Sequence, residues 1–332
     1  MSDTSSANDA AEAPPELTLV IPTHRRPDRC QRLLKWLCHQ TLDPKLFEVI
    51  VVDDASGDET GEVLERLVSE LPYRLRPMRT ELNRGPGPAR NLGWKAARAP
   101  IIAFTDDDCL PDSGWLEAGL RAVLDDPRLG VVQGKTEPSD LELLWSDRWN
   151  HAIHVTGPSA YFETCNIFYR KAALEAGGGF GEDYNWWGGW YCEDTIAGWR
   201  AVDAGWGRGF TLDARVTTEV ERRRIKWWIN KSLVHYIEVG VAKKHPGFRR
   251  EAWWRPWAPR RHDAAFALGC AGLIAATRRP AAAALVLPYM VIRRPPVRQP
   301  GFLRRCAQTA SVDTARFAGI IYGALKSRLF VI

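Results

Sequence analysis

Three consecutive carboxylates, Asp106, Asp107 and Asp108, come directly after a run of five apolar or β-favouring residues at 101–105. The run is typical of a strand buried on both faces of a parallel sheet, so the carboxylates stand where that strand ends. Carboxylates this close destabilise one another's charged forms unless a cation compensates them. We therefore expect a hard, oxygen-seeking ion, Mg²⁺ or Mn²⁺, at this point. The alternative is an acidic turn that only caps the helix beginning near Ser113.

Three more groups of polar residues occupy comparable positions in the chain. Residues 22–26 and 53–54 each follow a predicted strand, and residues 193–194 follow a loop rich in glycine and tryptophan. The carboxyl ends of parallel strands meet at one edge of a sheet, where open α/β folds bind their ligands. We expect these groups to converge there into one site.

A converged site of this kind suits a nucleoside diphosphate. An aspartate at the end of the second strand can accept hydrogen bonds from a base, and a divalent ion at the end of the fourth strand can neutralise a diphosphate. Arg25, Arg26 and Arg90 lie on the same loops and can neutralise the remaining charge. Each arginine considered alone would more often be a solvated surface residue.

Hydrophobic periodicity predicts the elements that hold these groups in place. The first part of the chain alternates strands with helices. The strands are predicted at 17–21, 47–52, 73–78 and 101–105, and the helices at 27–40, 59–71 and 89–99. Further strands are predicted at 130–133, 163–170 and 215–220, and further helices at 115–124, 171–176 and 194–204. This alternation predicts an α/β fold, with a mostly parallel twisted sheet and helices on both faces.

The composition limits the class of protein. Seven cysteines, an odd number with no Cys-x-x-Cys pair, argue against a disulfide framework and a structural zinc site and favour a reducing compartment. Residues 1–16 have neither a basic start nor an apolar core, so they predict a disordered leader rather than a signal peptide. Segment 85–93 lacks the spacing of a dinucleotide-binding loop and the sequence has no P-loop, which argues against a Rossmann dehydrogenase and a P-loop NTPase.

The last third of the chain differs in character from the rest. Residues 243–332 hold 17 Lys and Arg against three acidic residues, while the whole chain carries a net charge of +5, so the preceding part is acidic. Two apolar runs, 264–277 and 281–292, are each shorter than the roughly 20 residues of a membrane-spanning helix. They predict either a pair of buried helices or a helical hairpin that enters one leaflet, with the tryptophans of 253–257 at the interface.

Five motifs resemble, in their order and spacing, those of family 2 glycosyltransferases of GT-A fold. They are Val-Ile-Pro-Thr-His-Arg-Arg-Pro at 20–27, Val-Val-Asp-Asp-Ala-Ser-Gly-Asp-Glu-Thr at 51–60, Gly-Pro-Gly-Pro-Ala-Arg-Asn-Leu-Gly at 85–93, Phe-Thr-Asp-Asp-Asp at 104–108 and Trp-Tyr-Cys-Glu-Asp-Thr at 190–195. The resemblance covers about residues 17–220. It implies an inverting transfer of a sugar from a UDP- or GDP-linked donor to an acceptor hydroxyl.

The resemblance also implies roles on the donor side. Asp106 and Asp108 match the family's Asp-x-Asp, with Asp108 the principal metal ligand and Asp106 or Asp107 facing the ribose or the donor sugar. The other donor-binding positions fall on Asp54 with Asp53 beside it, and on Pro22, Thr23, Arg90 and Asn91. His235 and His245 are candidates for the family's histidine that binds metal or diphosphate, and the alternative for each is a surface or core histidine.

On the acceptor side, the resemblance assigns Asp194 as the general base, with Glu193 as the alternate. One in-line displacement needs a single carboxylate to take the acceptor's proton, on the face opposite the leaving nucleotide. The indoles of Trp186, Trp187 and Trp190 flank this pair and are expected either to stack on a sugar ring or only to pack. Transfer of a single sugar is expected, because the tail only loosely resembles the Gln-x-x-Arg-Trp of processive synthases.

These observations predict a leader at 1–16, a GT-A catalytic domain at 17–225 and a basic, Trp-rich helical region at 226–332 that associates with a membrane. The expected partners are a nucleotide-sugar donor, a lipid-linked or other cell-envelope glycan acceptor, and the anionic cytoplasmic face of the cell membrane; the cytoplasm is the alternative location. Two other functions stay open, a phosphatase or nucleotidyltransferase that uses the 106–108 cluster, and a non-catalytic protein that binds nucleotide or anionic lipid. Nucleic acid is not an expected partner, because the body is acidic and the tail carries apolar runs.

Overall fold

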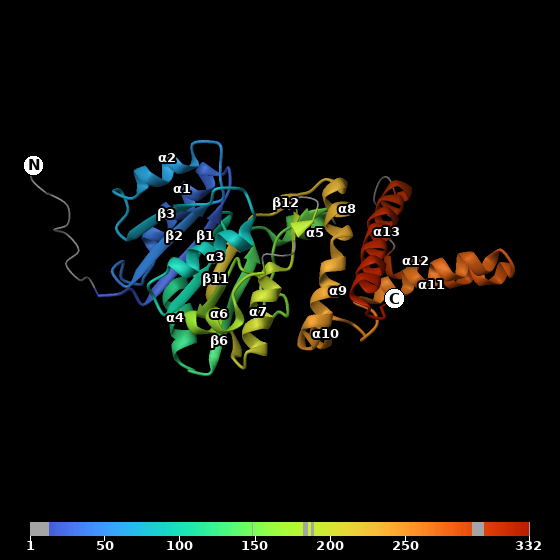
Figure 1. Cartoon of the computed structure of the whole chain (residues 1–332). Helices are drawn as coiled ribbons and strands as arrows, with labels where there is room; N and C mark the ends of the chain where they lie inside the picture. The colour runs from blue at the N-terminus through green and yellow to red at the C-terminus, as the bar shows by residue number, and fades with distance from the viewer. Residues whose placement is uncertain (1–12, 148, 182–184, 187–188, 294–301, 332) are drawn as a thin grey trace, which may run out of the picture.

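The computed structural model describes residues 13–147, 149–181, 185–186, 189–293 and 302–331. At its centre lies an eight-stranded sheet whose strands follow the order β3-β2-β1-β4-β8-β6-β11-β5 (Figure 1). These strands are β1 (Leu17–Thr23), β2 (Phe47–Asp53), β3 (Arg74–Arg79), β4 (Ile101–Phe104), β5 (Cys109–Pro111), β6 (Leu129–Pro138), β8 (Ile167–Arg170) and β11 (Gly207–Thr218).

The pairing of these strands is mostly parallel, as predicted. β3, β2, β1 and β4 run parallel to one another, and β6 runs parallel to β11. β8 is antiparallel to both β4 and β6, and β5 is antiparallel to β11. β1 and β2 are buried over their whole length, which is why their sequences read as continuous apolar runs.

Helices cover both faces of the sheet, which confirms the predicted layers (Figure 1). One face packs against α1 (Pro27–Trp36), α2 (Thr60–Leu67) and α4 (Trp115–Leu124). The other face packs against α3 (Pro86–Ala96), α6 (Lys171–Gly177) and α7 (Glu193–Asp203). Alternate residues of one strand serve the two cores, since Leu19 belongs to the first and Val20 to the second.

Several element boundaries differ from the prediction. Helix α3 begins at Pro86, three residues before the predicted start, because prolines fit the first turn of a helix, where the backbone N–H groups have no partner within the helix. Helix α2 ends at Leu67, and β11 begins at Gly207, well before the predicted residue 215. The shorter elements are the 3-10 turn η1 (Leu37–His39), α5 (Leu141–Ser146), β7 (Asn150–His151), β9 (Asn185–Trp186), β10 (Gly189–Trp190) and β12 (Glu221–Arg222).

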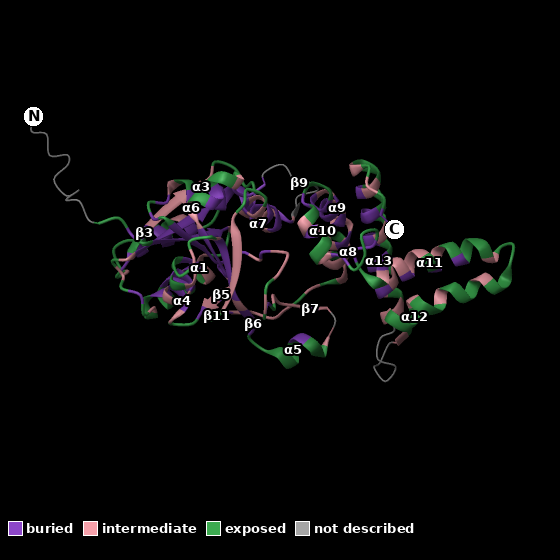
Figure 2. Cartoon of the chain, turned by 90° about the horizontal axis from the view of Figure 1, so that it is seen from below, coloured by how far each residue is buried: buried purple, intermediate pink, exposed green. Residues whose placement is uncertain are grey.

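The C-terminal part is helical. It comprises α8 (Ile225–Leu233), α9 (His235–Lys244), α10 (Pro246–Ala252), α11 (Arg261–Ala276), the 3-10 helix η2 (Pro280–Val286), α12 (Leu287–Arg293) and α13 (Phe302–Ser327). Helices α8 and α9 pack on α13, while α11 folds back on η2 and α12 as a hairpin that projects away from the body (Figures 1 and 2). Among the described residues, no helix is both long enough and apolar enough to cross a membrane.

Gly119 in α4 provides a test of the packing between this helix and the sheet. A Cβ added at Gly119 would lie 2.0 Å from Cζ of Phe168 on β8. Although alanine favours helix formation over glycine, we expect Gly119→Ala to destabilise the chain by about 1–3 kcal/mol, because the buried ring must move. The free energy of unfolding in urea measures this effect.

Gly157→Ala is the matched control, because no atom lies within 4 Å of its added Cβ. We expect it to change the free energy of unfolding by less than about 0.5 kcal/mol. A Gly119→Ala variant as stable as this control would contradict the packing of α4 on β8.

Candidate active site

The ends of β1 and β4 meet at the carboxylate of Asp107. The Thr23 hydroxyl donates to Asp107 Oδ2 over 2.8 Å, and Arg26 Nη1 donates to Oδ1 over 2.8 Å. The Asp107 side chain is only 4% exposed. Burial raises its pKa, and the charge of Arg26 opposes that rise. Asp107 therefore links the polar residues that follow β1, at 22–26, with the carboxylates that follow β4, at 106–108.

Arg90 connects the 106–108 carboxylates with a further group, residues 193–194. It extends from α3, is buried, and places Nη2 2.7 Å from Asp106 Oδ1 and Nη1 3.3 Å from Glu193 Oε1. Asp106 follows β4, whereas Glu193 begins α7 nearly ninety residues later. The buried guanidinium of Arg90 thus connects Asp106, which is predicted to bind the donor, with Glu193, which is predicted as the alternate general base.

Asp108 lies on the outer side of this cluster. Burial, followed by the charges of Asp106 and Asp107, raises its pKa to about 6, while Arg26 and Arg29 act in the opposite direction. Ligand atoms of Asp106, Asp108 and Cys109 lie within 4.8 Å of one another. A hydrogen bond with Cys165 and burial raise the pKa of the Cys109 thiol, so it stays protonated and is a poor ligand for a hard cation. The two carboxylates fit Mg²⁺ or Mn²⁺, because such an ion would relieve their mutual repulsion.

The raised pKa of Asp108 makes a prediction about Mn²⁺ binding. A proton and the ion compete for the same carboxylate, and the proton occupies it below a pH of about 6 in the metal-free chain. We expect the apparent Mn²⁺ affinity to be nearly constant above that pH and to fall about tenfold per pH unit below it. Free Mn²⁺ measured by electron paramagnetic resonance gives the affinity, and equal values at pH 5 and pH 7 would contradict the prediction.

The carboxylates of Asp53 and Asp54 are engaged with the protein itself. Asp54 accepts hydrogen bonds from the Thr80 hydroxyl at 2.8 Å and from the backbone N–H groups of residues 84 and 85. Asp53 accepts from the backbone of Ser56 at 2.9 Å and from Arg79 at 2.5 Å. The contacts of Asp54 fix the loop before α3, and those of Asp53 fix the loop after β2.

Pro22 and Arg25 complete the loop after β1. Pro22 is buried in the strand, whereas Arg25 is exposed and adopts a positive φ of 53°. The backbone N–H of Arg25 donates to the Ser56 hydroxyl over 2.8 Å. The loops after β1 and β2 are thereby held together, with the Arg25 side chain directed to solvent.

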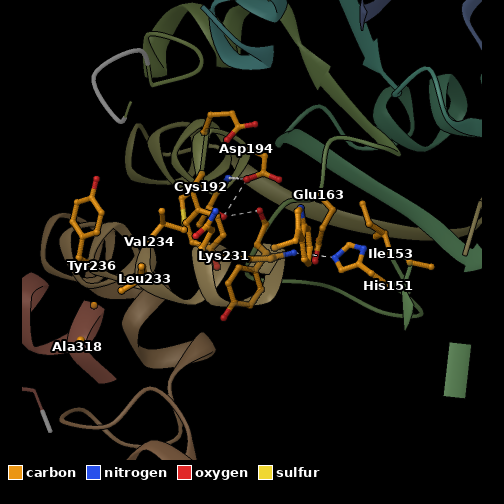
Figure 3. Close-up of a pocket in the computed structure, with 18 of the residues that line it drawn as sticks. His151, Ile153, Glu163, Cys192, Asp194, Lys231, Leu233, Val234, Tyr236 and Ala318 are labelled. Atoms are coloured by element: carbon orange, nitrogen blue, oxygen red, sulfur yellow. Dashed lines mark hydrogen bonds between the residues drawn. The ribbon is translucent and has the colours of Figure 1, made fainter. Parts of the chain in front are cut away.

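Asp194 faces a cavity of about 940 Å³ (Figure 3). It lies in the first turn of α7, and its Oδ1 accepts from the Thr195 backbone at 2.7 Å. Burial, the charge of Glu193 and the charge of Glu163 raise the pKa of Asp194 well above its usual range. A carboxylate with a raised pKa beside a cavity is suited to accept a proton.

Comparison with known proteins identifies the family of this chain. Residues 18–186 match the family model described as glycosyl transferase family 2. The chain is a family 2 glycosyltransferase. It is 28% identical over 283 residues to validoxylamine A glucosyltransferase of Streptomyces hygroscopicus subsp. limoneus, which covers 72% of this chain and 59% of that protein. It is 27% identical over 248 residues to pre-mycofactocin glycosyltransferase of Mycobacterium tuberculosis, covering 70% of this chain and 48% of that protein.

Solved structures share the fold of this glycosyltransferase. Mannosyltransferase PcManGT from Pyrobaculum calidifontis aligns with a TM-score of 0.66 and 21% identity, over 95% of this chain and 88% of that one. Staphylococcus aureus TarS aligns with a TM-score of 0.52 and 17% identity, over 91% of this chain and 55% of that one. These likenesses show the GT-A fold. The chain spans about half to three fifths of the length of the two relatives named above.

The two candidate histidines of the glycosyltransferase are engaged in other contacts. His235 Nδ1 donates to the Ser232 carbonyl over 2.9 Å, and its Nε2 accepts from Arg316. His245 contacts Asp203, 2.6 Å away, through Nδ1. In this arrangement neither ring nitrogen of His235 keeps a free lone pair, and its role as a metal ligand stays a prediction. The sequence could not reveal this contact, since Arg316 lies 81 residues further on.

The predicted stacking tryptophans fall largely outside the described part of the glycosyltransferase. Trp187 lies outside it entirely. For Trp186 in β9 and Trp190 in β10, the structure describes the backbone pairing but not the side chains. Their role toward an acceptor stays a prediction.

Most residues that line the cavity of the glycosyltransferase were not among the predicted site residues. Glu163, His151 and Lys231 come from segments that carry no recognisable motif. Lys231 occupied a predicted basic tail, and its position opposite His151 depends on α8 packing against β7. Only the folded chain brings these residues beside Asp194.

Proposed function

We propose that this family 2 glycosyltransferase moves one sugar, with inversion, from a UDP- or GDP-linked donor to an acceptor hydroxyl. The observation that carries the proposal is the buried bridge of Arg90 between Asp106 and Glu193. It holds the donor-side carboxylates and the candidate base in one site. The cavity in front of Asp194 has room for an acceptor.

In the proposed reaction, the acceptor oxygen forms a bond to the anomeric carbon of the sugar while the bond from that carbon to the diphosphate breaks. Asp194 takes the hydroxyl proton, and the nucleoside diphosphate leaves with the bonding electron pair. Mg²⁺ or Mn²⁺ held by Asp106 and Asp108 would stabilise the negative charge of the leaving diphosphate. Arg90 holds Glu193 and Asp106 in place, and Thr23 holds Asp107.

Structural neighbours support the class of donor. The solved structure of PcManGT is a complex with GDP-Man and Mn²⁺, and one of TarS, with a TM-score of 0.51, is a complex with UDP-GlcNAc. Both donors are nucleotide diphosphate sugars. We propose the same class for this chain, with the base held near Asp53 and Asp54 and against Pro22 and Thr23.

Calorimetric titration with a panel of UDP-, GDP- and dTDP-sugars, with and without Mn²⁺, tests this proposal. We expect one donor to bind the wild-type chain only with metal and to lose that binding in Asp108→Ala. Asp112→Ala, which removes an exposed neighbouring carboxylate, is expected to bind as the wild type does. If no nucleotide sugar binds under any metal condition, the proposed function fails.

We also propose that the hairpin of α11, η2 and α12 binds the anionic surface at the cytoplasmic face of the cell membrane. The hairpin exposes apolar side chains, including Ile274 at 74% and Val291 at 66%, and carries Arg278 and Arg279 at its turn. Exposed apolar faces with flanking arginines suit an interface with anionic lipid. A lipid-linked acceptor would be reached there.

Vesicle flotation tests this binding. We expect the wild-type chain to float with vesicles containing anionic phosphatidylglycerol, and the double variant Ile274→Ser, Val291→Ser to bind at least about tenfold less, because two large apolar side chains are lost. Leu82→Ser, which changes a 70% exposed leucine on the catalytic body, is the control and is expected to bind normally. Equal binding of all three chains would contradict the proposal.

A further inference from the structure

The cavity beside Asp194 has walls of opposite charge. It lies between α7, β7, α8 and α13, and three carboxylates line it, those of Glu163, Glu193 and Asp194. The ammonium of Lys231 lines another part of the wall (Figure 3). A ligand that fills this cavity therefore meets proton acceptors in one place and a cation in another.

Lys231 is held by two neutral groups. Its Nζ lies 2.9 Å from Nε2 of His151 and 4.7 Å from the centroid of the Trp227 ring, one helical turn earlier in α8. Burial and the charge of Lys231 lower the pKa of His151 to about 4, so the imidazole is neutral and accepts the hydrogen bond. The neutral imidazole therefore does not compensate the positive charge of Lys231.

In the described part of the chain, no carboxylate oxygen lies within 4.0 Å of Lys231 Nζ. An ammonium has three N–H donors, and His151 and the Trp227 ring occupy two directions. At least one donor is left for a ligand in the cavity. Burial and the charge of Arg260 lower the pKa of Lys231 to about 8, which leaves it mostly charged at neutral pH. The charge of Asp194 acts on this ammonium without contacting it, so an anionic ligand in direct contact would reduce the cost of burying the cation.

Apolar side chains line a further part of the cavity wall. Leu233 and Val234 line it at the end of α8, and Ala318 and Tyr322 line it from α13. α13 is fixed closely against α8, because a Cβ added at Gly319 would lie 2.3 Å from the Leu233 carbonyl oxygen. The apolar wall is therefore a constant part of the cavity, and it suits the hydrocarbon part of a ligand.

We propose that this cavity binds the acceptor, and that the acceptor is an amphiphile whose phosphate group is bound by Lys231 while its hydroxyl lies at Asp194. The inference rests on the proposed function, because an acceptor is needed only if sugar transfer occurs. The guanidinium groups of Arg223 and Arg260 add positive charge near Lys231, whereas Asp194 adds negative charge. We take a phosphate as the anionic group because it offers several strong acceptor oxygens to the free N–H donors of the ammonium. Lys231 is then a residue that determines acceptor specificity.

Calorimetry with three small probes tests this inference on the full chain. Octyl phosphate below its micellar concentration carries both features, octanol carries only the apolar part, and inorganic phosphate carries only the charge. We expect octyl phosphate to bind at least about tenfold more tightly than either of the others, as one charged hydrogen bond plus apolar burial would give. Inorganic phosphate that binds as tightly as octyl phosphate would overturn the inference, because the apolar wall would then contribute nothing.

Variants of Lys231 show whether this residue is responsible. Lys231→Gln is expected to lose the preference for octyl phosphate over octanol, while Lys231→Arg keeps it. Lys226→Gln, which removes an exposed lysine from the same helix, is the matched control and is expected to keep the preference in full. If Lys231→Gln, folded with a normal thermal transition, keeps the preference, or if Lys231→Arg loses it as the glutamine variant does, the inference is overturned.

Donor binding by the wild-type chain separates this inference from the proposed function. If a nucleotide sugar binds with metal but octyl phosphate shows no preference over octanol, only the acceptor inference fails. If no nucleotide sugar binds, the proposed function fails, and with it the identification of the cavity ligand as an acceptor.

Discussion

Replacing Asp194 with asparagine is expected to lower the rate of sugar transfer by about 10²–10⁴-fold, the range typical of losing a general base. Asparagine keeps the shape of the side chain and the hydrogen bond from Thr195, but it cannot take the acceptor's proton. Donor binding should be unchanged, because Asp194 lies on the acceptor side of Arg90. Turnover of the donor and its dissociation constant, measured on the same preparation, test both statements.

The stability of Asp194→Asn distinguishes loss of chemistry from loss of structure. The pKa of Asp194 is raised in the folded chain, so its ionisation at neutral pH opposes folding. Asparagine cannot ionise, and we therefore expect a melting temperature at pH 7.5 equal to or above that of the wild type. Glu193→Gln is the companion variant, and a larger loss of rate in it than in Asp194→Asn would reverse the two assignments.

Replacing Arg90 with methionine is expected to destabilise the chain by about 3 kcal/mol. Removing one partner of a buried ion pair leaves its carboxylates uncompensated, and Asp106 and Glu193 would both lose theirs. Arg90 also lowers the pKa of Asp194, so the variant should need a higher pH to reach its maximal transfer rate. Urea unfolding and the pH profile of turnover measure the two effects.

Arg66→Met is the control for the loss of an arginine. The Arg66 side chain is 56% exposed, and its contacts with Glu70 at 3.6 Å and with Gln31 at 3.4 Å lie at the surface, so its replacement should cost less than about 0.5 kcal/mol. A cost for Arg90→Met as small as for Arg66→Met would show that the buried bridge does not hold the site together.

The convergence of polar residues at one edge of the sheet could be predicted from the sequence for a physical reason. Strands buried on both faces are continuous runs of apolar or β-favouring residues, so 47–52 and 101–105 were recognisable, and polar residues directly after them had to lie at one edge. The contacts of Thr23 with Asp107 and of Arg90 with Asp106 and Glu193 confirm that convergence.

Other features depend on contacts between distant segments. Strand direction has no signature in a short apolar run, so the antiparallel placement of β8 between β4 and β6 could not be predicted. The predicted roles of Asp53 and His235 were inferred from their position in the sequence, whereas their partners, Arg79 and Arg316, are set by packing. The pairing of Lys231 with His151 crosses 80 residues and is of the same kind.

The stereochemistry of transfer tests the central claim most directly, and it requires no knowledge of the natural acceptor. The wild-type chain is incubated with its nucleotide sugar, Mn²⁺ and methanol, and the anomeric proton of the methyl glycoside is observed by nuclear magnetic resonance. A single displacement assisted by Asp194 predicts a product whose anomeric configuration is opposite to that of the donor, and no such product from Asp194→Asn. A methyl glycoside that retains the donor's configuration would contradict the account.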